Sequence, residues 1–186
     1  EWAKKSLKGN EIKGKTIGII GFGNVGKRFA QICNALGLKV LIFSKTFDAI
    51  KNDFPEYVSC DLNNIIKDAD IISFHCKPNL DGSPILGTKE ISKMKKNVLI
   101  INTARGNLVL EKDLNDAIVN KTIGGVALDV FEKEPVNNSI LFGLENVLLT
   151  PHIAASTEEA QVIVAEMIAN QFVDFFLKNK VNNSVI

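Results

Sequence analysis

The sequence predicts an α/β fold in which parallel strands form one sheet with helices on both of its faces. Three observations lead to this prediction. Short apolar segments without polar alternation recur along the 186 residues, which is typical of strands that are buried on both faces. Apolar residues at helical spacing occupy the intervals between these segments, as they do when crossover helices connect parallel strands. A glycine-rich turn joins the first apolar segment to the first helical one.

The first strand and the turn after it form the most specific pattern in the chain. Residues 17–20 are apolar and are predicted to be a buried strand, and a helical spacing of apolar residues begins at Val25. Between them, Gly21, Gly23 and Gly26 form a Gly-x-Gly-x-x-Gly run. Strand, glycine turn and helix in this order are the context that a dinucleotide-binding fingerprint requires. We expect Gly21 to permit the tight turn, Gly23 to let the backbone approach a pyrophosphate, and Gly26 to let the helix lie close on the strand.

The same turn nearly matches a second phosphate-binding motif. Gly21, Gly26 and Lys27 fit a Walker A loop, but Arg28 stands where that motif needs the Ser or Thr that holds Mg²⁺. Because this hydroxyl is missing and Gly23 occupies the middle dinucleotide position, nucleotide hydrolysis is disfavoured. In a dinucleotide site, the N–H groups and the positive dipole end of the helix would face the phosphates.

After the first helix, which we expect to end at Gly37, strands and helices continue to alternate. The further predicted strands span residues 39–43, 71–74, 98–102, 123–128 and 147–149, and the further helices span 61–67, 111–119 and a long run from residue 156. Asp61 is placed to cap the first of these helices. The last helix opens with Ser156-x-x-Glu159, the pattern of a capping box, and segment 46–56 is rich in turn residues. The predicted architecture is a Rossmann-type, doubly wound parallel sheet.

Composition and charge exclude several classes of function. The formal net charge is +1, so there is no electrostatic case for binding nucleic acid or an anionic membrane. Cys33, Cys60 and Cys76 show neither a CxxC spacing nor an even number, which favours reduced thiols in a cytoplasmic protein and gives no sign of a metal site. No apolar run approaches about 20 residues, and no signal-peptide pattern opens the chain.

The segment after the second predicted strand should contact the adenosine ribose. A carboxylate about 20 positions past the glycines usually accepts the ribose hydroxyls of NAD. Here that place is held by Ser44, followed by Lys45 and Thr46. A carboxylate would repel a 2′-phosphate, whereas serine and lysine tolerate or bind one. A surface turn with one lysine explains the residues equally well, so NAD and NADP both stay open.

Charged residues stand directly after three of the predicted strands. Arg105 follows the strand at 98–102, the carboxylates of 129–135 follow the next one, and His152 follows the last. The carboxyl ends of parallel strands meet at the sheet edge where ligands bind. There, arginine can hold a substrate carboxylate in a fork, and a histidine paired with a carboxylate can donate a proton to a carbonyl oxygen. The other histidine, His75, is expected to be structural.

Four motifs, in this order along the chain, resemble those of the D-isomer-specific 2-hydroxyacid dehydrogenases. They are Gly-Phe-Gly-Asn-Val-Gly at 21–26, Asn-Thr-Ala-Arg-Gly at 102–106, Asp-Val-Phe-Glu-Lys-Glu-Pro at 129–135 and Pro-His-Ile-Ala-Ala-Ser-Thr at 151–157. The resemblance implies hydride transfer between a nicotinamide cofactor and a D-2-hydroxy or 2-oxo acid. By position, it makes Arg105 the substrate-binding arginine, His152 the proton donor and Glu134 the carboxylate that pairs with His152.

The fingerprint and the resemblance together give a set of expected contacts to NAD or NADP. The expected cofactor-binding residues are Gly21, Gly23, Asn24, Val25, Gly26, Ser44, Lys45, Cys76, Thr103, Ala104, Arg105, Asp129, His152, Ala154 and Ala155. Two positions depart from the family's pattern. Ser44 replaces the usual aspartate, which puts a preference for NAD in doubt, and Lys77 stands where a proline is common.

The resemblance also sets the expected domain organisation. Residues 1–153 should be a dinucleotide-binding domain, entered through a basic segment anchored by Trp2. Residues 154–186 should be a helix that returns towards a substrate domain mostly missing from this chain, which begins with Glu1 and reads as a fragment. We therefore expect no turnover from these residues alone. We also expect a homodimer or higher homo-oligomer formed through the cofactor domain. The expected substrate is a small-molecule 2-oxo or 2-hydroxy acid, and no nucleic-acid or membrane partner is expected.

Two other classes of function compete with the dehydrogenase. One is a non-catalytic dinucleotide sensor or scaffold, since relatives with corepressor roles share this architecture and can retain Arg105, Glu134 and His152. The other is an α/β domain with a degenerate glycine turn. Cofactor binding separates the second class from the rest, and turnover separates the first from an enzyme.

Overall fold

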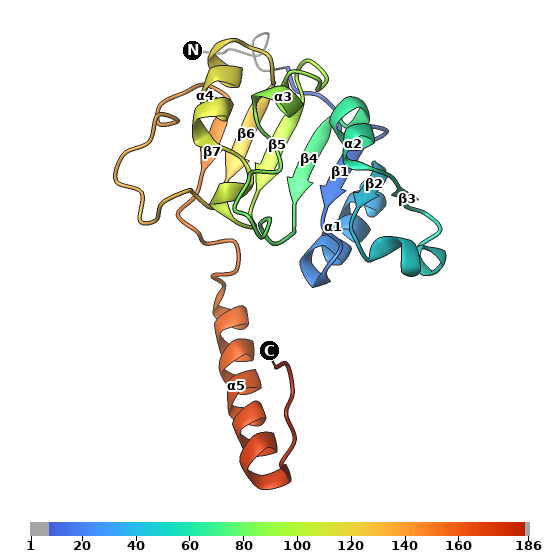
Figure 1. Cartoon of the computed structure of the whole chain (residues 1–186), viewed down its shortest axis with the longest axis vertical. Coiled ribbons are helices and arrows are strands. Elements are labelled where there is room, and N and C mark those ends of the chain that lie inside the picture. The colour runs from blue at the N-terminus through green and yellow to red at the C-terminus, as the bar shows by residue number, and fades with distance from the viewer. Residues whose placement is uncertain (1–7, 185–186) are drawn as a thin grey trace. The chain divides into compact units, whose positions relative to one another are not determined.

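The computed structural model describes residues 8–184, which contain a seven-stranded sheet with the strand order β3-β2-β1-β4-β5-β6-β7 (Figure 1). Its strands are β1 (Thr16–Ile20), β2 (Lys39–Phe43), β3 (Val58–Ser59), β4 (Ile71–Phe74), β5 (Leu99–Asn102), β6 (Gly125–Leu128) and β7 (Val147–Leu149). Every neighbouring pair is parallel. The predicted doubly wound parallel sheet is confirmed, whereas the expected anchor Trp2 lies outside the described residues.

Helices fall between the strands, as the sequence predicts for crossover connections, and the last helix follows β7. They are α1 (Asn24–Ala35), α2 (Leu62–Asp68), α3 (Thr88–Ile91), α4 (Glu111–Val119) and α5 (Glu158–Lys178), with short 3-10 turns at Phe47–Ala49, Lys51–Asp53 and Gly106–Leu108. Gly37 follows the end of α1 with a φ of 80°, a backbone conformation in which glycine has no steric penalty. Asp61 caps α2 as predicted, because its Oδ1 accepts a hydrogen bond of 2.8 Å from the Asn64 N–H.

Two hydrophobic clusters occupy the opposite faces of the sheet. Alternate residues of a strand point to opposite faces, and accordingly Ile17 and Ile19 of β1 belong to one cluster while Ile20 belongs to the other. The first cluster includes Ala30 and Cys33 of α1. The second contains buried residues of α2, α3 and α4, and of β4, β5 and β6. Helices therefore cover both faces, which explains why the strands lack polar alternation.

The direction of winding reverses next to β1. The chain runs outward from β1 through β2 to β3, and then crosses to the other side of β1 to form β4 and the strands beyond it (Figure 1). Ligands of open α/β sheets bind at such a reversal, in the crevice outside the carboxyl ends of the strands. In this sheet those ends are Ile20 of β1 and Phe74 of β4.

Three local features differ from the sequence prediction. The two-residue strand β3 and the four-residue helix α3 were not predicted, because neither is long enough to show a period. The capping-box prediction for Ser156 is wrong by one residue. Thr157 is the N-cap, and its hydroxyl accepts a hydrogen bond of 3.1 Å from the Ala160 N–H. With an alanine at the third helical position, no side chain is available to return the bond as a capping box does.

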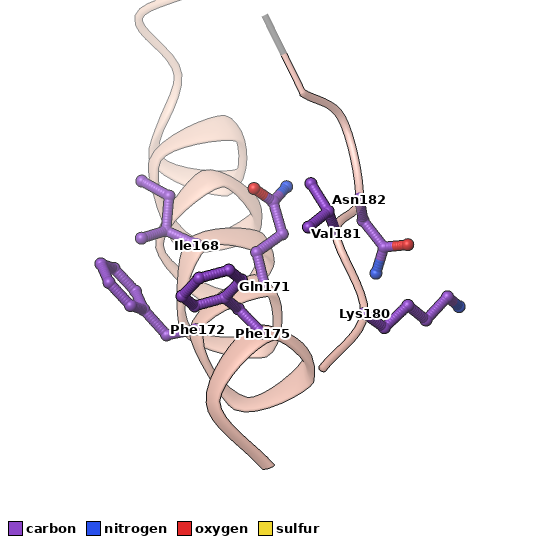
Figure 2. A pocket seen from close by; sticks show the side chains of 7 residues that line it. All are labelled: Ile168, Gln171, Phe172, Phe175, Lys180, Val181 and Asn182. Carbon is purple, nitrogen blue, oxygen red and sulfur yellow. The ribbon is translucent and has the colours of Figure 1, made fainter. Parts of the chain in front are cut away.

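The chain divides into two compact units, one up to Pro151 and the other from His152 onwards. In the second unit, α5 exposes large apolar side chains, among them Val162, Met167 and Phe172. Within residues 8–184 it is the one helix long and apolar enough to cross a membrane, by length and composition alone. The residues after it return along its side. There, Asp174 accepts hydrogen bonds from Lys180 and Asn182, and a hollow of about 230 Å³ lies between helix and tail (Figure 2).

The cap of α2 leads to a stability prediction. Asp61→Ala removes the acceptor for the Asn64 N–H, so we expect the free energy of unfolding to fall by about 1 kcal/mol. Asp61→Asn keeps an acceptor at the same position and should restore most of the loss. Urea unfolding of the three proteins measures this, and an alanine variant as stable as the wild type would show that the cap contributes nothing.

Candidate functional site

The glycine turn between β1 and α1 is fixed by its neighbours on both sides. Gly21 has a φ of 102° and donates a hydrogen bond of 2.9 Å to the Phe43 carbonyl at the end of β2. On the other side, the His75 N–H donates to the Ile20 carbonyl at 2.7 Å. A Cβ at Gly21 would collide with the His75 backbone. A positive φ and this close approach together restrict the position to glycine.

The other two glycines of the turn differ in their surroundings, because Gly26 is tightly packed and Gly23 is open. A Cβ at Gly26 would meet the Gly21 carbonyl, so the start of α1 lies directly on the turn. By contrast, a Cβ at Gly23 would meet no atom within 4 Å. Gly23 is also the N-cap of α1, and no side chain caps this helix end. Its backbone N–H groups are thus available to an anion, an arrangement that suits a pyrophosphate.

A hollow of about 250 Å³ lies beside this helix end, at the carboxyl ends of β4 and β5. Three segments that are far apart in the sequence form its walls. The residues that line it are Val25, His75, Cys76, Lys77, Pro78, Thr103, Ala104 and Arg105. Five of the residues expected to contact the cofactor therefore share one hollow at the point where the winding of the sheet reverses.

The Asn102 side chain shapes the turn that carries Arg105. Asn102 ends β5 and is 1% exposed. Its amide nitrogen donates to the Arg105 carbonyl at 2.8 Å, and its amide oxygen accepts from the Ala104 N–H at 3.0 Å. The Arg105 guanidinium donates to the Ala104 carbonyl at 2.6 Å. In the sequence, Asn102 stands out only as the first residue of the motif at 102–106. A polar amide that ends an otherwise apolar strand is the signal that could have identified its role.

Gly106 holds the same turn against the segment after β6. A Cβ at Gly106 would occupy the position of the Phe131 carbonyl group. The Phe131 N–H in turn donates a hydrogen bond of 3.0 Å to Oε1 of Glu134. Gly106 therefore packs directly on Phe131, and Phe131 is hydrogen-bonded to the Glu134 carboxylate. This close packing makes glycine the residue that fits at position 106.

Asp129 lies at the same edge of the sheet, directly after β6. It is 3% exposed, and its Oδ1 accepts a hydrogen bond of 2.6 Å from the Thr150 hydroxyl. This bond joins the ends of β6 and β7. His152, Ala154 and Ala155 belong to the second compact unit, where His152 has a φ of 55°. The roles expected for these three residues stay predictions.

The segment after β2 presents hydroxyl and amine groups. The Ser44 hydroxyl accepts from the Thr46 N–H at 3.4 Å and lies 3.3 Å from the Thr46 hydroxyl. The next carboxylate along the chain, Asp48, accepts a hydrogen bond of 2.8 Å from the Ser59 hydroxyl and lies 3.3 Å from Lys51 Nζ. The Ser59 bond is the main cause of the lowered pKa of Asp48.

Burial keeps His75 and Cys76 uncharged at the wall of the hollow. Burial lowers the pKa of His75 to about 4, and it raises the pKa of the Cys76 thiol. The His75 Nε2 lies 3.0 Å from the Ser73 hydroxyl, and the ring lies 5.0 Å from that of Phe29. Both contacts support the structural role expected for this histidine.

Comparison with known proteins identifies the family. The sequence model described as "D-isomer specific 2-hydroxyacid dehydrogenase, NAD binding domain" matches residues 1–154.

The chain belongs to this dehydrogenase family.

Individual relatives agree with this assignment. A hydroxypyruvate reductase of Thermotoga maritima is 42% identical over 87% of the chain and 53% of its own length. A D-3-phosphoglycerate dehydrogenase of a Synechocystis species is 37% identical over 95% of the chain and 32% of its own length. Among solved structures, D-lactate dehydrogenase of Lactobacillus jensenii with NAD⁺ gives a TM-score of 0.84 at 30% identity, over 95% of this chain and 56% of that one. The chain thus spans between about a third and about half of these dehydrogenases.

The partly buried imidazole of His75 leads to a prediction about pH. In the unfolded chain its pKa is near 6.5, and in the folded chain it is about 4. As pH falls below 6.5, His75 binds a proton in the unfolded state, whereas in the folded state it stays neutral until the pH is much lower. The free energy of unfolding should therefore fall with pH. His75→Gln should remove this part of the slope. The matching experiment is urea unfolding of both proteins between about pH 5 and 7, above the range in which carboxylates titrate. If the free energy of unfolding depended equally on pH in the two proteins, the prediction would be contradicted. His152 is present in both proteins and so does not affect the comparison.

Proposed function

We propose that this chain is the cofactor-binding part of an NAD(P)-dependent oxidoreductase that interconverts D-2-hydroxy acids and 2-oxo acids. One observation carries the proposal. The uncapped start of α1, open at Gly23, lies beside a hollow that contains Arg105. A pyrophosphate at the helix end would leave the other half of a dinucleotide close to a group that can bind a carboxylate.

Different groups at the site would bind the pyrophosphate of the cofactor and the carboxylate of the substrate. Backbone N–H groups at Gly23, Asn24 and Val25 would hold the pyrophosphate. A bound nicotinamide would supply or accept the hydride. Arg105 has five N–H donors, of which one is directed to the Ala104 carbonyl. The others can take the substrate carboxylate in a bidentate contact, which orients the 2-carbon of the substrate for hydride transfer.

His152 would transfer the proton of the reaction, and Glu134 would favour its charged form. In the proposed reduction, the His152 imidazolium donates its proton to the carbonyl oxygen of the 2-oxo acid, and in the reverse reaction the imidazole takes it back. A carboxylate near a histidine favours the charged ring. One oxygen of Glu134 accepts a hydrogen bond from the Phe131 N–H, which restrains this carboxylate.

The substrate proposed first is D-3-phosphoglycerate, oxidised to 3-phosphohydroxypyruvate in the cytoplasm as a step of serine biosynthesis by a homodimer. Two segments support it, the run 152–161 and the ending 182–186, because both resemble D-3-phosphoglycerate dehydrogenase. A reductase for hydroxypyruvate or glyoxylate is the second candidate. It is favoured by the 42% identity with the Thermotoga maritima hydroxypyruvate reductase. Comparing kcat/KM for the three oxo acids, with a longer protein that contains this chain, separates the candidates.

Three substitutions in that longer protein test the catalytic roles. His152→Ala should lower kcat by about 10²–10⁴-fold, the usual contribution of general acid catalysis. Arg105→Ala should mainly raise KM for the oxo acid, because a bidentate contact is lost. Glu134→Gln should move the basic limb of the pH–rate profile to lower pH, because the imidazolium loses its partner.

The control for these variants is Glu159→Gln, at an exposed position in the first turn of α5. It should leave both constants unchanged. A near-normal kcat for His152→Ala would exclude the assigned proton donor. Normal cofactor binding without turnover on any oxo acid in the wild type would favour the sensor class.

We further propose that the site accepts a 2′-phosphorylated cofactor. The hydroxyls of Ser44 and Thr46 and the amine of Lys45 offer donors after β2, and the segment 44–47 holds no carboxylate. The nearest carboxylate in the sequence, Asp48, already accepts a bond from Ser59. Repulsion of a 2′-phosphate by a ribose-binding carboxylate is therefore missing from this segment.

The prediction is that NADPH binds at least as tightly as NADH. Ser44→Asp restores the carboxylate, and we expect it to weaken NADPH binding by about tenfold or more, equivalent to about 1.4 kcal/mol, while NADH binding improves. Titration calorimetry with both cofactors measures the four dissociation constants. If wild type prefers NADH by tenfold, Ser44 is only a tolerated change. No heat with either cofactor, from well-folded protein, would refute the proposed cofactor role.

A further inference from the structure

Four aromatic rings meet beside the glycine turn. Phe22 lies between Gly21 and Gly23 in the sequence, and its ring centroid is 4.6 Å from that of Phe47, 5.2 Å from Phe54 and 6.0 Å from Tyr57. We name Phe22, Phe47, Phe54 and Tyr57 the ring cluster. The three contacts of Phe22 are edge-on, a geometry that aromatic pairs favour.

The ring cluster connects two segments that would both contact the adenosine half of a dinucleotide. One is the glycine turn, through Phe22. The other follows β2, where the Phe47 N–H lies 3.4 Å from the Ser44 carbonyl that it bonds. The bond from the Gly21 N–H to the Phe43 carbonyl joins the same two segments through the backbone. The ring contacts and this backbone bond therefore join the segment after β2 to the glycine turn.

Phe54 is the member of the ring cluster that faces the helix. Phe22, Phe47 and Tyr57 are buried, whereas Phe54 is half-buried. Its ring is stacked on Tyr57 with planes 8° apart. Lys27, in the first turn of α1, places its Nζ 4.6 Å from the Phe54 centroid, a cation–π contact. No acidic residue occupies that helical turn, and the face of the ring offers this cation a favourable contact.

We propose that Phe54 is a positioning residue for the adenosine half of the cofactor. By packing on Phe22 and on Tyr57 and by lying under Lys27, it fixes the glycine turn relative to the segment after β2. A site whose donors are fixed before binding loses less conformational entropy when the ligand arrives. This inference rests on the proposed cofactor role, and it adds a residue that lies outside the glycine motif and acts on it through Phe22.

The test uses the full chain and two probes that lack the nicotinamide, ADP-ribose and its 2′-phosphate. Phe54→Leu removes the ring and should weaken the better probe by about tenfold, which corresponds to about 1.4 kcal/mol. Phe54→Tyr keeps the ring, and its hydroxyl can point to solvent, so its affinity should stay within about twofold of the wild type. Phe54→Met replaces the leucine variant if that variant does not fold.

A matched control separates positioning from general loss of stability. Leu114→Ala in α4 removes a fully buried side chain from the other hydrophobic cluster and should lower the melting temperature without changing affinity. Titrations are made where thermal unfolding shows every variant folded. Wild-type affinity in Phe54→Leu, or an equal loss in Leu114→Ala, would overturn the inference and leave the proposed function standing. A wild type that binds neither probe would overturn both.

Discussion

The glycine turn depends on two backbone hydrogen bonds that join it to the strands on either side of β1. One runs from the Gly21 N–H to the Phe43 carbonyl, and the other from the His75 N–H to the Ile20 carbonyl. They hold the turn at the place where the winding of the sheet reverses. These bonds also bring the His75 backbone so close to Gly21 that a side chain at position 21 would collide with it. The position therefore requires glycine. The hollow, the helix end and the ring cluster all take their positions from this turn.

The parts of the fold that the sequence predicts are those determined by local periodicity. The apolar run 17–20, the glycine spacing and the Asp61 cap depend on residues close together in the chain, and each has the predicted structure. The capping prediction for Ser156 was wrong because Thr157, which is also a favoured N-cap residue, stands one position later and caps the helix. A two-residue strand such as β3 exists only through its pairing with β2, so no local pattern could reveal it.

The candidate site also has features that could be predicted from the sequence and features that could not. The positions of Val25, Cys76 and Arg105 around one hollow follow from the rule that carboxyl ends of parallel strands share an edge. The ring cluster does not follow from that rule, because Phe22 and Phe54 are separated by a strand, a helix and two 3-10 turns. The role of Asn102 depends on which way its amide points inside a closed turn. Long-range side-chain packing of this kind is specified by the whole chain at once.

The contact of Gly106 with Phe131 bears on how this protein could be engineered. Libraries that aim to alter ligand binding at the hollow would naturally vary the residues around Arg105. Thr103 and Ala104 line the hollow and can be randomised with side chains that protrude into it. Gly106 meets the backbone of another segment where its own side chain would lie, and Asn102 uses both ends of its amide to close the turn. A combinatorial library is therefore best built with those two codons held constant.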